Sequence, residues 1–219
     1  MKNRITDITP KGAAMIAGVA FIVSVLIVTV IDDFLLANFV VPGDTAALAN
    51  DIAENTRRFV FAVIAYLSVL ILDSLIGLAH YVVLRPADKT RALLTAALRL
   101  LYAGALIIGL VALVFQIVDA YGYAAIKLCG YAFFALHIFV LGYSVFKSGY
   151  IPKILGVLLI IASFLYAVFF IDFQPPEALL VLIMLTMAGA ELALSVWLIV
   201  KRNTLPERSL RGGEAMSLG

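Results

Sequence analysis

The sequence predicts an all-α membrane protein, a bundle of six transmembrane helices with both termini in the cytoplasm. Composition, the spacing of long apolar segments and the placement of basic residues lead to this fold class. Of the 219 residues, 64% are hydrophobic and 14% are charged, whereas soluble domains have roughly 45–50% and 25%. Such an apolar chain requires lipid as its solvent.

Each transmembrane helix needs about 20 mostly apolar residues. Six segments meet this requirement, at about residues 13–36, 59–84, 92–118, 128–146, 151–171 and 178–200. The apolar run Ala13–Ile31 is too long for a signal peptide, so we expect it to remain as the first span. Pro152 stands at the start of the fifth span, where a missing N–H costs nothing, and no proline lies in the interior of a span, so no kink is predicted. We therefore expect a six-span domain over residues 1–202 and a disordered cytoplasmic tail over 203–219.

Lysine and arginine set the expected orientation, because they favour cytoplasmic segments. With the N-terminus inside, twelve of them are cytoplasmic: Lys2, Arg4, Lys11, Arg85, Lys89, Arg91, Lys147, Lys153, Lys201, Arg202, Arg208 and Arg211. Three lie outside: Arg57, Arg58 and Lys127. This bias predicts cytoplasmic termini.

Two segments in the fourth and fifth spans resemble the sequences of a known family. His137-Ile-Phe-Val-Leu-Gly-Tyr143, followed by Lys147-Ser-Gly-Tyr-Ile-Pro-Lys-Ile-Leu-Gly156, resembles a bacterial membrane family known as domain of unknown function 4386. The Ser-Gly-Tyr-Ile-Pro-Lys segment is the most specific part, and the resemblance covers nearly the whole chain. Family members usually carry Leu-Tyr where this chain has His80-Tyr81. The resemblance implies a multi-span protein of the bacterial inner membrane and implies no particular activity.

Four ionisable residues lie deep inside predicted spans, where each costs about 2.5–3.5 kcal/mol on insertion scales. At 1.5 Å per residue from the nearest cytoplasmic basic residue, Asp73 lies roughly 18 Å deep, Arg99 roughly 12 Å, and His137 and Glu191 roughly 15 Å. Four helices therefore place an ionisable side chain in one narrow layer. Such residues are often functional.

Asp73 and Arg99 lie on a predicted helical hairpin that turns near residue 87. Arg99 lies opposite roughly residue 76 and can reach one turn to Asp73, which predicts an ion pair. Tyr102 is placed to donate a hydrogen bond to the carboxylate. The pair either contributes to a functional site or only fixes the register of the two helices.

Glu191 has three alternatives: it shares Arg99, it bonds His137, or it is protonated. A carboxyl group beside a histidine suits a proton relay, and equally a structural hydrogen bond between helices. Two further alternatives use both histidines, His80 and His137. One is a bis-histidine haem site, and the other is a metal-dependent hydrolase site that also uses Asp73 or Glu191. The depths of the two histidines differ, and no spacing motif supports either site, so we predict no cofactor and no metal.

The leading functional interpretation is a membrane protein that binds or moves a small solute, lipid or proton. Its site comprises Asp73, Arg99, Tyr102, His137, Glu191 and His80. One alternative is a non-catalytic subunit or assembly protein whose buried charges fix packing. Another is an intramembrane hydrolase, although we favour a protein that is not an enzyme.

Expected partners are the bilayer, a small-molecule or lipid ligand, and further copies or a larger membrane complex, without nucleic acid. The loop 42–58 is expected to hold a short helix capped by Asp44.

Overall fold

The computed structural model describes residues 8–31, 54–171 and 175–206, which are helical with short connections. The helices are α1 (Pro10–Ile31), α3 (Thr56–Leu84), α4 (Lys89–Val114), α5 (Ala120–Lys147), α6 (Lys153–Leu165) and α7 (Glu177–Lys201). Two 3-10 helices extend them, η3 (Tyr166–Phe170) after α6 and η4 (Arg202–Thr204) after α7. Six helical segments are long and apolar enough to cross a membrane. The predicted all-α fold with six candidate spans is confirmed.

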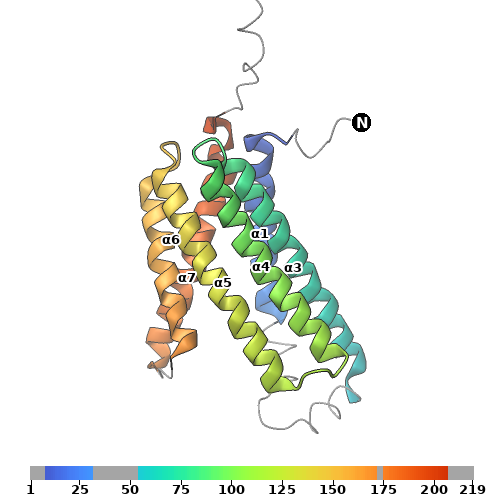
Figure 1. Cartoon of the computed structure of the whole chain (residues 1–219). Helices are drawn as coiled ribbons and strands as arrows, with labels where there is room; N and C mark the ends of the chain where they lie inside the picture. The colour runs from blue at the N-terminus through green and yellow to red at the C-terminus, as the bar shows by residue number, and fades with distance from the viewer. Residues whose placement is uncertain (1–7, 32–53, 172–174, 207–219) are drawn as a thin grey trace, which may run out of the picture.

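The helices form a closed ring in chain order. Each helix packs against the next one along the chain, and α7 also packs against α1. Successive helices run in opposite directions, so the described chain begins and ends at the same end of the bundle (Figure 1). At that end Arg85 donates a hydrogen bond of 3.4 Å to the Ile8 carbonyl. The order of the helices around the bundle, which no sequence motif encodes, follows the chain.

The outer surface of the ring is apolar. Large hydrophobic side chains that are more than half exposed occur on every helix of the ring; they include Leu26, Ile64, Ile108, Leu136, Phe164, Leu185 and Val200. Exposed leucine, isoleucine, valine and phenylalanine are stable in lipid and unfavourable in water. This surface indicates that a bilayer surrounds the bundle.

Several helix boundaries correct the sequence prediction. The helix α5 begins at Ala120, eight residues earlier than predicted, because the Asp119 carboxylate caps it by accepting a 2.8 Å hydrogen bond from the Gly122 N–H. Lys127 consequently lies within this helix. The fifth span starts at Lys153 and changes to a 3-10 helix at Tyr166, a change that no proline signals. The other boundaries that can be compared agree within four residues.

Some predictions fall outside the described residues. These are the end of the first span at residues 32–36, most of the loop that carries Asp44, and the tail after residue 206. The last residues of that loop, from Thr56, already belong to α3.

The turn between α5 and α6 is the segment that carries the most specific part of the family resemblance. Gly149 has φ +80, a left-handed conformation that favours glycine. The Ser148 hydroxyl accepts a 3.2 Å hydrogen bond from the Ile151 N–H. The Tyr150 hydroxyl donates a 2.7 Å hydrogen bond to the Val83 carbonyl of α3. Burial raises the pKa of Tyr150 to about 12, so this hydroxyl remains a donor at neutral pH. The turn therefore ties α5 and α6 to α3.

Glycines allow two helix pairs to approach to backbone contact. A Cβ atom on Gly142 of α5 would lie 2.8 Å from the Gly156 carbonyl oxygen of α6. A Cβ atom on Gly18 of α1 would lie 2.7 Å from the Ser195 carbonyl oxygen of α7. Small residues of this kind permit close packing of helices in membranes.

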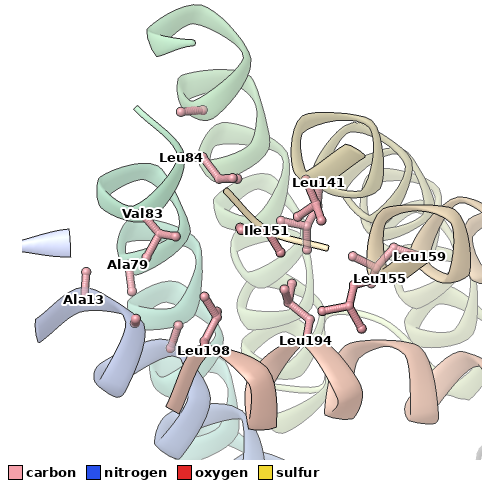
Figure 2. Packing of buried hydrophobic residues seen from close by; sticks show 14 of the residues in the cluster. Ala13, Ala79, Val83, Leu84, Leu141, Ile151, Leu155, Leu159, Leu194 and Leu198 are labelled. Atoms are coloured by element: carbon pink, nitrogen blue, oxygen red, sulfur yellow. The ribbon is translucent and has the colours of Figure 1, made fainter. Parts of the chain in front are cut away.

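The half of the bundle nearest the described chain ends is densely packed. Figure 2 shows apolar side chains of this half meeting in the interior of the ring. The cluster includes Ala13, Ala79, Val83, Leu84, Ala92, Leu141, Leu155, Leu159, Leu194 and Leu198. Ile151 from the turn before α6 completes this layer and is 4% exposed. The interior of the ring is therefore closed at this end by hydrophobic packing.

Candidate functional site

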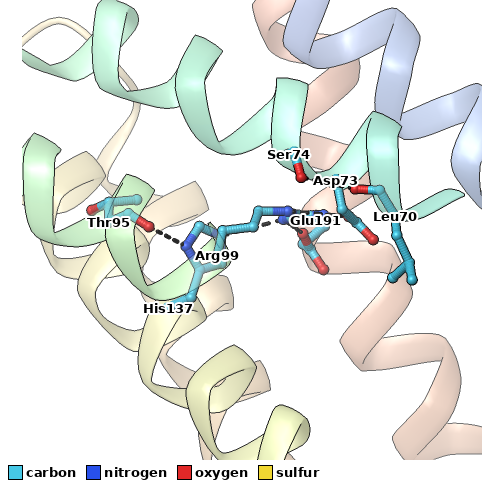
Figure 3. Close-up of polar contacts among 7 residues, drawn as sticks. All are labelled: Leu70, Asp73, Ser74, Thr95, Arg99, His137 and Glu191. Atoms are coloured by element: carbon cyan, nitrogen blue, oxygen red, sulfur yellow. Dashed lines mark hydrogen bonds and ion pairs between the residues drawn. The ribbon is translucent and has the colours of Figure 1, made fainter. Parts of the chain in front are cut away.

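Arg99 is the centre of a buried polar cluster. It lies in the middle of α4, is 1% exposed, and reaches across the interior of the ring (Figure 3). Its Nε donates a 3.1 Å hydrogen bond to Asp73 Oδ1 on α3, and its Nη2 donates to the same oxygen. Its Nη1 donates a 2.8 Å hydrogen bond to Glu191 Oε2 on α7. The predicted ion pair with Asp73 is confirmed, and Glu191 takes the first of its three alternatives by sharing Arg99.

Gly77 provides the space for this arrangement on α3. It lies one turn after Asp73, and a Cβ atom there would lie 3.2 Å from Arg99 Cβ. A larger residue would push α3 away from α4 and lengthen the contact between Asp73 and Arg99. The local sequence therefore places a carboxylate and a small residue on the same face of one helix.

His137 on α5 joins the cluster from the opposite side of Arg99. Its Nδ1 lies 2.8 Å from the Thr95 carbonyl, and its Nε2 lies 3.2 Å from Arg99 Nη1. A carbonyl oxygen can only accept, so we assign the proton to Nδ1, which leaves the Nε2 lone pair to accept from Arg99. His137 is fully buried. Its link to Glu191 runs through Arg99, and a direct bond between His137 and Glu191, one of the three alternatives, is absent among the described contacts.

Two predicted site residues lie beside the cluster. The His80 ring stacks on His137 with centroids 6.1 Å apart, and its buried Nδ1 has no hydrogen-bond partner among the described residues. Tyr102 was expected to bond the Asp73 carboxylate. Within the described part of the chain it makes no such bond, and its ring instead packs on Phe134 at 4.5 Å. That expectation is wrong, and the observed contact of Tyr102 is this tilted packing of its ring on Phe134.

A cavity of about 270 Å³ opens next to the cluster. Asp73, Arg99 and Glu191 line it, together with residues of α1, α3, α4, α5, η3 and α7. Its α1 lining comes from the second half of that helix, including Ser24, and its α7 lining comes from the middle of that helix, between Met184 and Glu191. At about 30 Å³ per molecule, this volume equals that of roughly nine waters. The buried charges therefore lie against a cavity on one side and against the apolar layer on the other.

Aromatic rings form much of the cavity wall. Tyr131 contacts Phe169 at 5.1 Å, Phe169 contacts Tyr166 at 5.9 Å, and Tyr166 contacts Phe134 at 5.2 Å between centroids. None of these four rings was predicted as part of the site. The sequence of α5 could have indicated two of them, because Tyr131 and Phe134 precede His137 at a regular three-residue spacing. Tyr166 and Phe169 share that spacing in η3, where residues three apart lie on the same face.

The two histidines do not form a metal or haem site. Both ring nitrogens of His137 already take part in hydrogen bonds, to Thr95 and Arg99. Within residues 8–31, 54–171 and 175–206, no three His, Cys, Asp or Glu side chains are grouped so that they could hold a metal ion. The described geometry therefore offers no ligand set for the hydrolase or haem alternatives.

Comparison with known proteins places this fold in a family. An uncharacterized protein from Archaeoglobus fulgidus is 36% identical over 109 residues, which cover 50% of this chain and 65% of that protein. The archaeal source of this relative leaves the expected bacterial origin a prediction. No solved structure matches the chain. The family model of domain of unknown function 4386 matches residues 16–201, from α1 to the end of α7. The chain therefore belongs to the family of domain of unknown function 4386.

Proposed function

We propose that this membrane protein binds a small solute inside its helix ring, against the cluster of Arg99, Asp73 and Glu191. The observation that carries the proposal is the cavity that reaches these buried charges. Charges inside a membrane that only fix packing need no cavity beside them, whereas a binding site needs one. The aromatic wall adds the mainly apolar lining that is typical of small-molecule sites.

The dense layer at the other end supports binding and argues against an open channel. Leu141, Leu159 and Leu194 are at most 2% exposed in this layer, which supports a closed end within the described part of the chain. Movement of a solute through the ring would require the helices to separate there.

We also infer that the packed end faces the cytoplasm. Among the described residues, Lys11, Arg85, Lys89, Arg91, Lys147, Lys153, Lys201 and Arg202 lie at or near this end. Arg57, Arg58 and Lys127 lie toward the other end. This asymmetry supports cytoplasmic termini by the positive-inside rule, with the cavity on the opposite side of the cluster. The bacterial inner membrane remains the predicted location.

A structural role is the second candidate, and one observation favours it. Each of the four deep ionisable residues already has a partner within the cluster: Arg99 contacts Asp73, His137 and Glu191 at once. A fully connected polar network can fix helix register without binding anything. The chain would then act as a non-catalytic subunit or assembly protein.

Native mass spectrometry of the protein extracted with its own membrane lipids distinguishes the two candidates. We expect a small non-lipid adduct on the wild type, and its loss in Ala188→Trp, because the indole fills the cavity that Ala188 lines. Ala178→Trp is the matched control, since Ala178 is also exposed on α7 but does not line the cavity. A wild-type protein that carries only lipid, or an adduct that survives Ala188→Trp, would favour the structural role.

A further inference from the structure

The charges of the cavity indicate which class of solute it accepts. The described lining includes two carboxyl groups and one guanidinium group, those of Asp73, Glu191 and Arg99. The guanidinium of Arg99 donates to both carboxylates, which is the arrangement that ionised acceptors favour. Acidic groups therefore outnumber basic groups by two to one among these three lining residues, which favours a cationic ligand over an anionic one.

The carboxylates also retain acceptor capacity. Arg99 bonds Asp73 through Oδ1 and Glu191 through Oε2. None of the hydrogen bonds among the described residues reaches Asp73 Oδ2 or Glu191 Oε1. Both residues line the cavity, and neither oxygen is among the buried atoms that lack a partner in the described structure. Carboxylate oxygens at the wall of a cavity favour a donor or a positive charge. An anion entering the cavity would instead meet two carboxylates whose counter-ion is already shared.

The aromatic wall also favours a positively charged ligand. Tyr102, Tyr131, Tyr166 and Phe169 line the cavity together with Phe134. Two rings of this wall already have a cation beside them: the Arg99 guanidinium carbon lies 5.1 Å from the centroid of Phe134, and Lys127 Nζ lies 5.7 Å from the centroid of Tyr131. Aromatic faces attract cations by their quadrupole, most strongly where water is excluded. Aromatic rings around a carboxylate suit a positively charged organic group.

We propose, building on the solute-binding function above, that the cavity takes a small organic cation, an amine or quaternary ammonium, held by Asp73 and Glu191 and surrounded by the aromatic wall. The excess carboxylate supplies the charge that the ligand neutralises. The rings supply apolar and cation–π contact for its carbon substituents. The limited volume restricts the ligand to a compact molecule.

Three probes of one shape test this proposal on the purified full chain: choline, its neutral carbon isostere 3,3-dimethylbutan-1-ol, and the anion 3,3-dimethylbutanoate. Isothermal titration calorimetry should show choline binding at least tenfold more tightly than the alcohol, and no saturable binding of the anion. In Glu191→Gln, whose amide oxygen can still accept from Arg99, choline affinity should fall at least tenfold. Glu177→Gln changes the same charge at the exposed start of α7 and should leave the affinity unchanged.

Equal affinity for choline and the alcohol, tighter binding of the anion, or no choline binding would overturn the cation assignment. So would an unchanged choline affinity in Glu191→Gln. The solute-binding function would still stand if the wild type carried a neutral or anionic adduct that Ala188→Trp removes. Calorimetry therefore tests the cation assignment, and native mass spectrometry tests solute binding itself.

Discussion

Replacing Arg99 with methionine is expected to lower the free energy of unfolding by about 3–5 kcal/mol, the typical cost of removing one partner from a buried ion pair. The substitution leaves Asp73 and Glu191 facing each other without their shared counter-ion, and it removes the donor to His137 Nε2. Reversible unfolding in mixed micelles measures this loss. Arg99→Lys is expected to recover only part of it, because a single ammonium group lacks the planar fork that reaches three partners.

Two further variants show whether the loss arises from unpaired charge. Arg91→Met is the control, since Arg91 forms a half-exposed pair with its helix neighbour Asp88, and ion pairs in contact with solvent contribute about 1 kcal/mol or less. A triple variant, Asp73→Leu with Arg99→Met and Glu191→Met, removes every charge of the cluster and should regain most of the stability. Equal free energies of unfolding for Arg99→Met and Arg91→Met would contradict the role of Arg99 as the shared partner of the buried cluster.

Replacing Gly142 with alanine is expected to destabilise the bundle by about 1–3 kcal/mol, the usual cost of overpacking. The added methyl group would lie 2.8 Å from the Gly156 carbonyl oxygen and 2.9 Å from the Ile160 nitrogen. Both are backbone atoms, so relief requires α5 and α6 to separate. Because the two helices also hold His137 and the aromatic wall, the same substitution should widen the cavity.

Gly104 and Gly189 are matched controls for this experiment. Both lie inside helices, and an added Cβ on either has no atom within 4 Å. Alanine at these positions should stabilise the protein by about 0.5–1 kcal/mol, because it restricts the unfolded chain more than glycine does. Thermal unfolding in one detergent compares the three variants directly. Equal melting temperatures for Gly142→Ala and Gly104→Ala would refute close backbone packing between α5 and α6.

Much of the buried cluster could be predicted from residue spacing. A transmembrane helix has a fixed rise, so the distance of Asp73, Arg99, His137 and Glu191 from the nearest basic residue determines their depth. The pairing of Asp73 with Arg99 followed from the hairpin turn between their helices. Both steps use local geometry, which the sequence encodes directly.

The cavity could not be predicted in this way. It depends on the order of the helices around the ring and on the packing of α1 against α7, which are far apart in the chain. Tyr166 and Phe169 come into line only because the last turn of the fifth span is a 3-10 helix. Tyr102 was assigned to the carboxylate because its helical position suits that bond, but packing against Phe134 determines where its ring lies.

Cysteine labelling tests most directly whether a solvent-reaching cavity meets the buried charges. Ser24 lines the cavity and Ser163 lies elsewhere on α6, yet both are 7% exposed. In a Cys129→Ala background, which removes the exposed native thiol, a membrane-impermeant methanethiosulfonate should modify Ser24→Cys and leave Ser163→Cys unmodified. Labelling of Ser24→Cys should also slow when Ala188→Trp fills the cavity. Equal protection of the two cysteines would contradict the account, because the charges of Asp73, Arg99 and Glu191 would then be sealed from water and available only for packing.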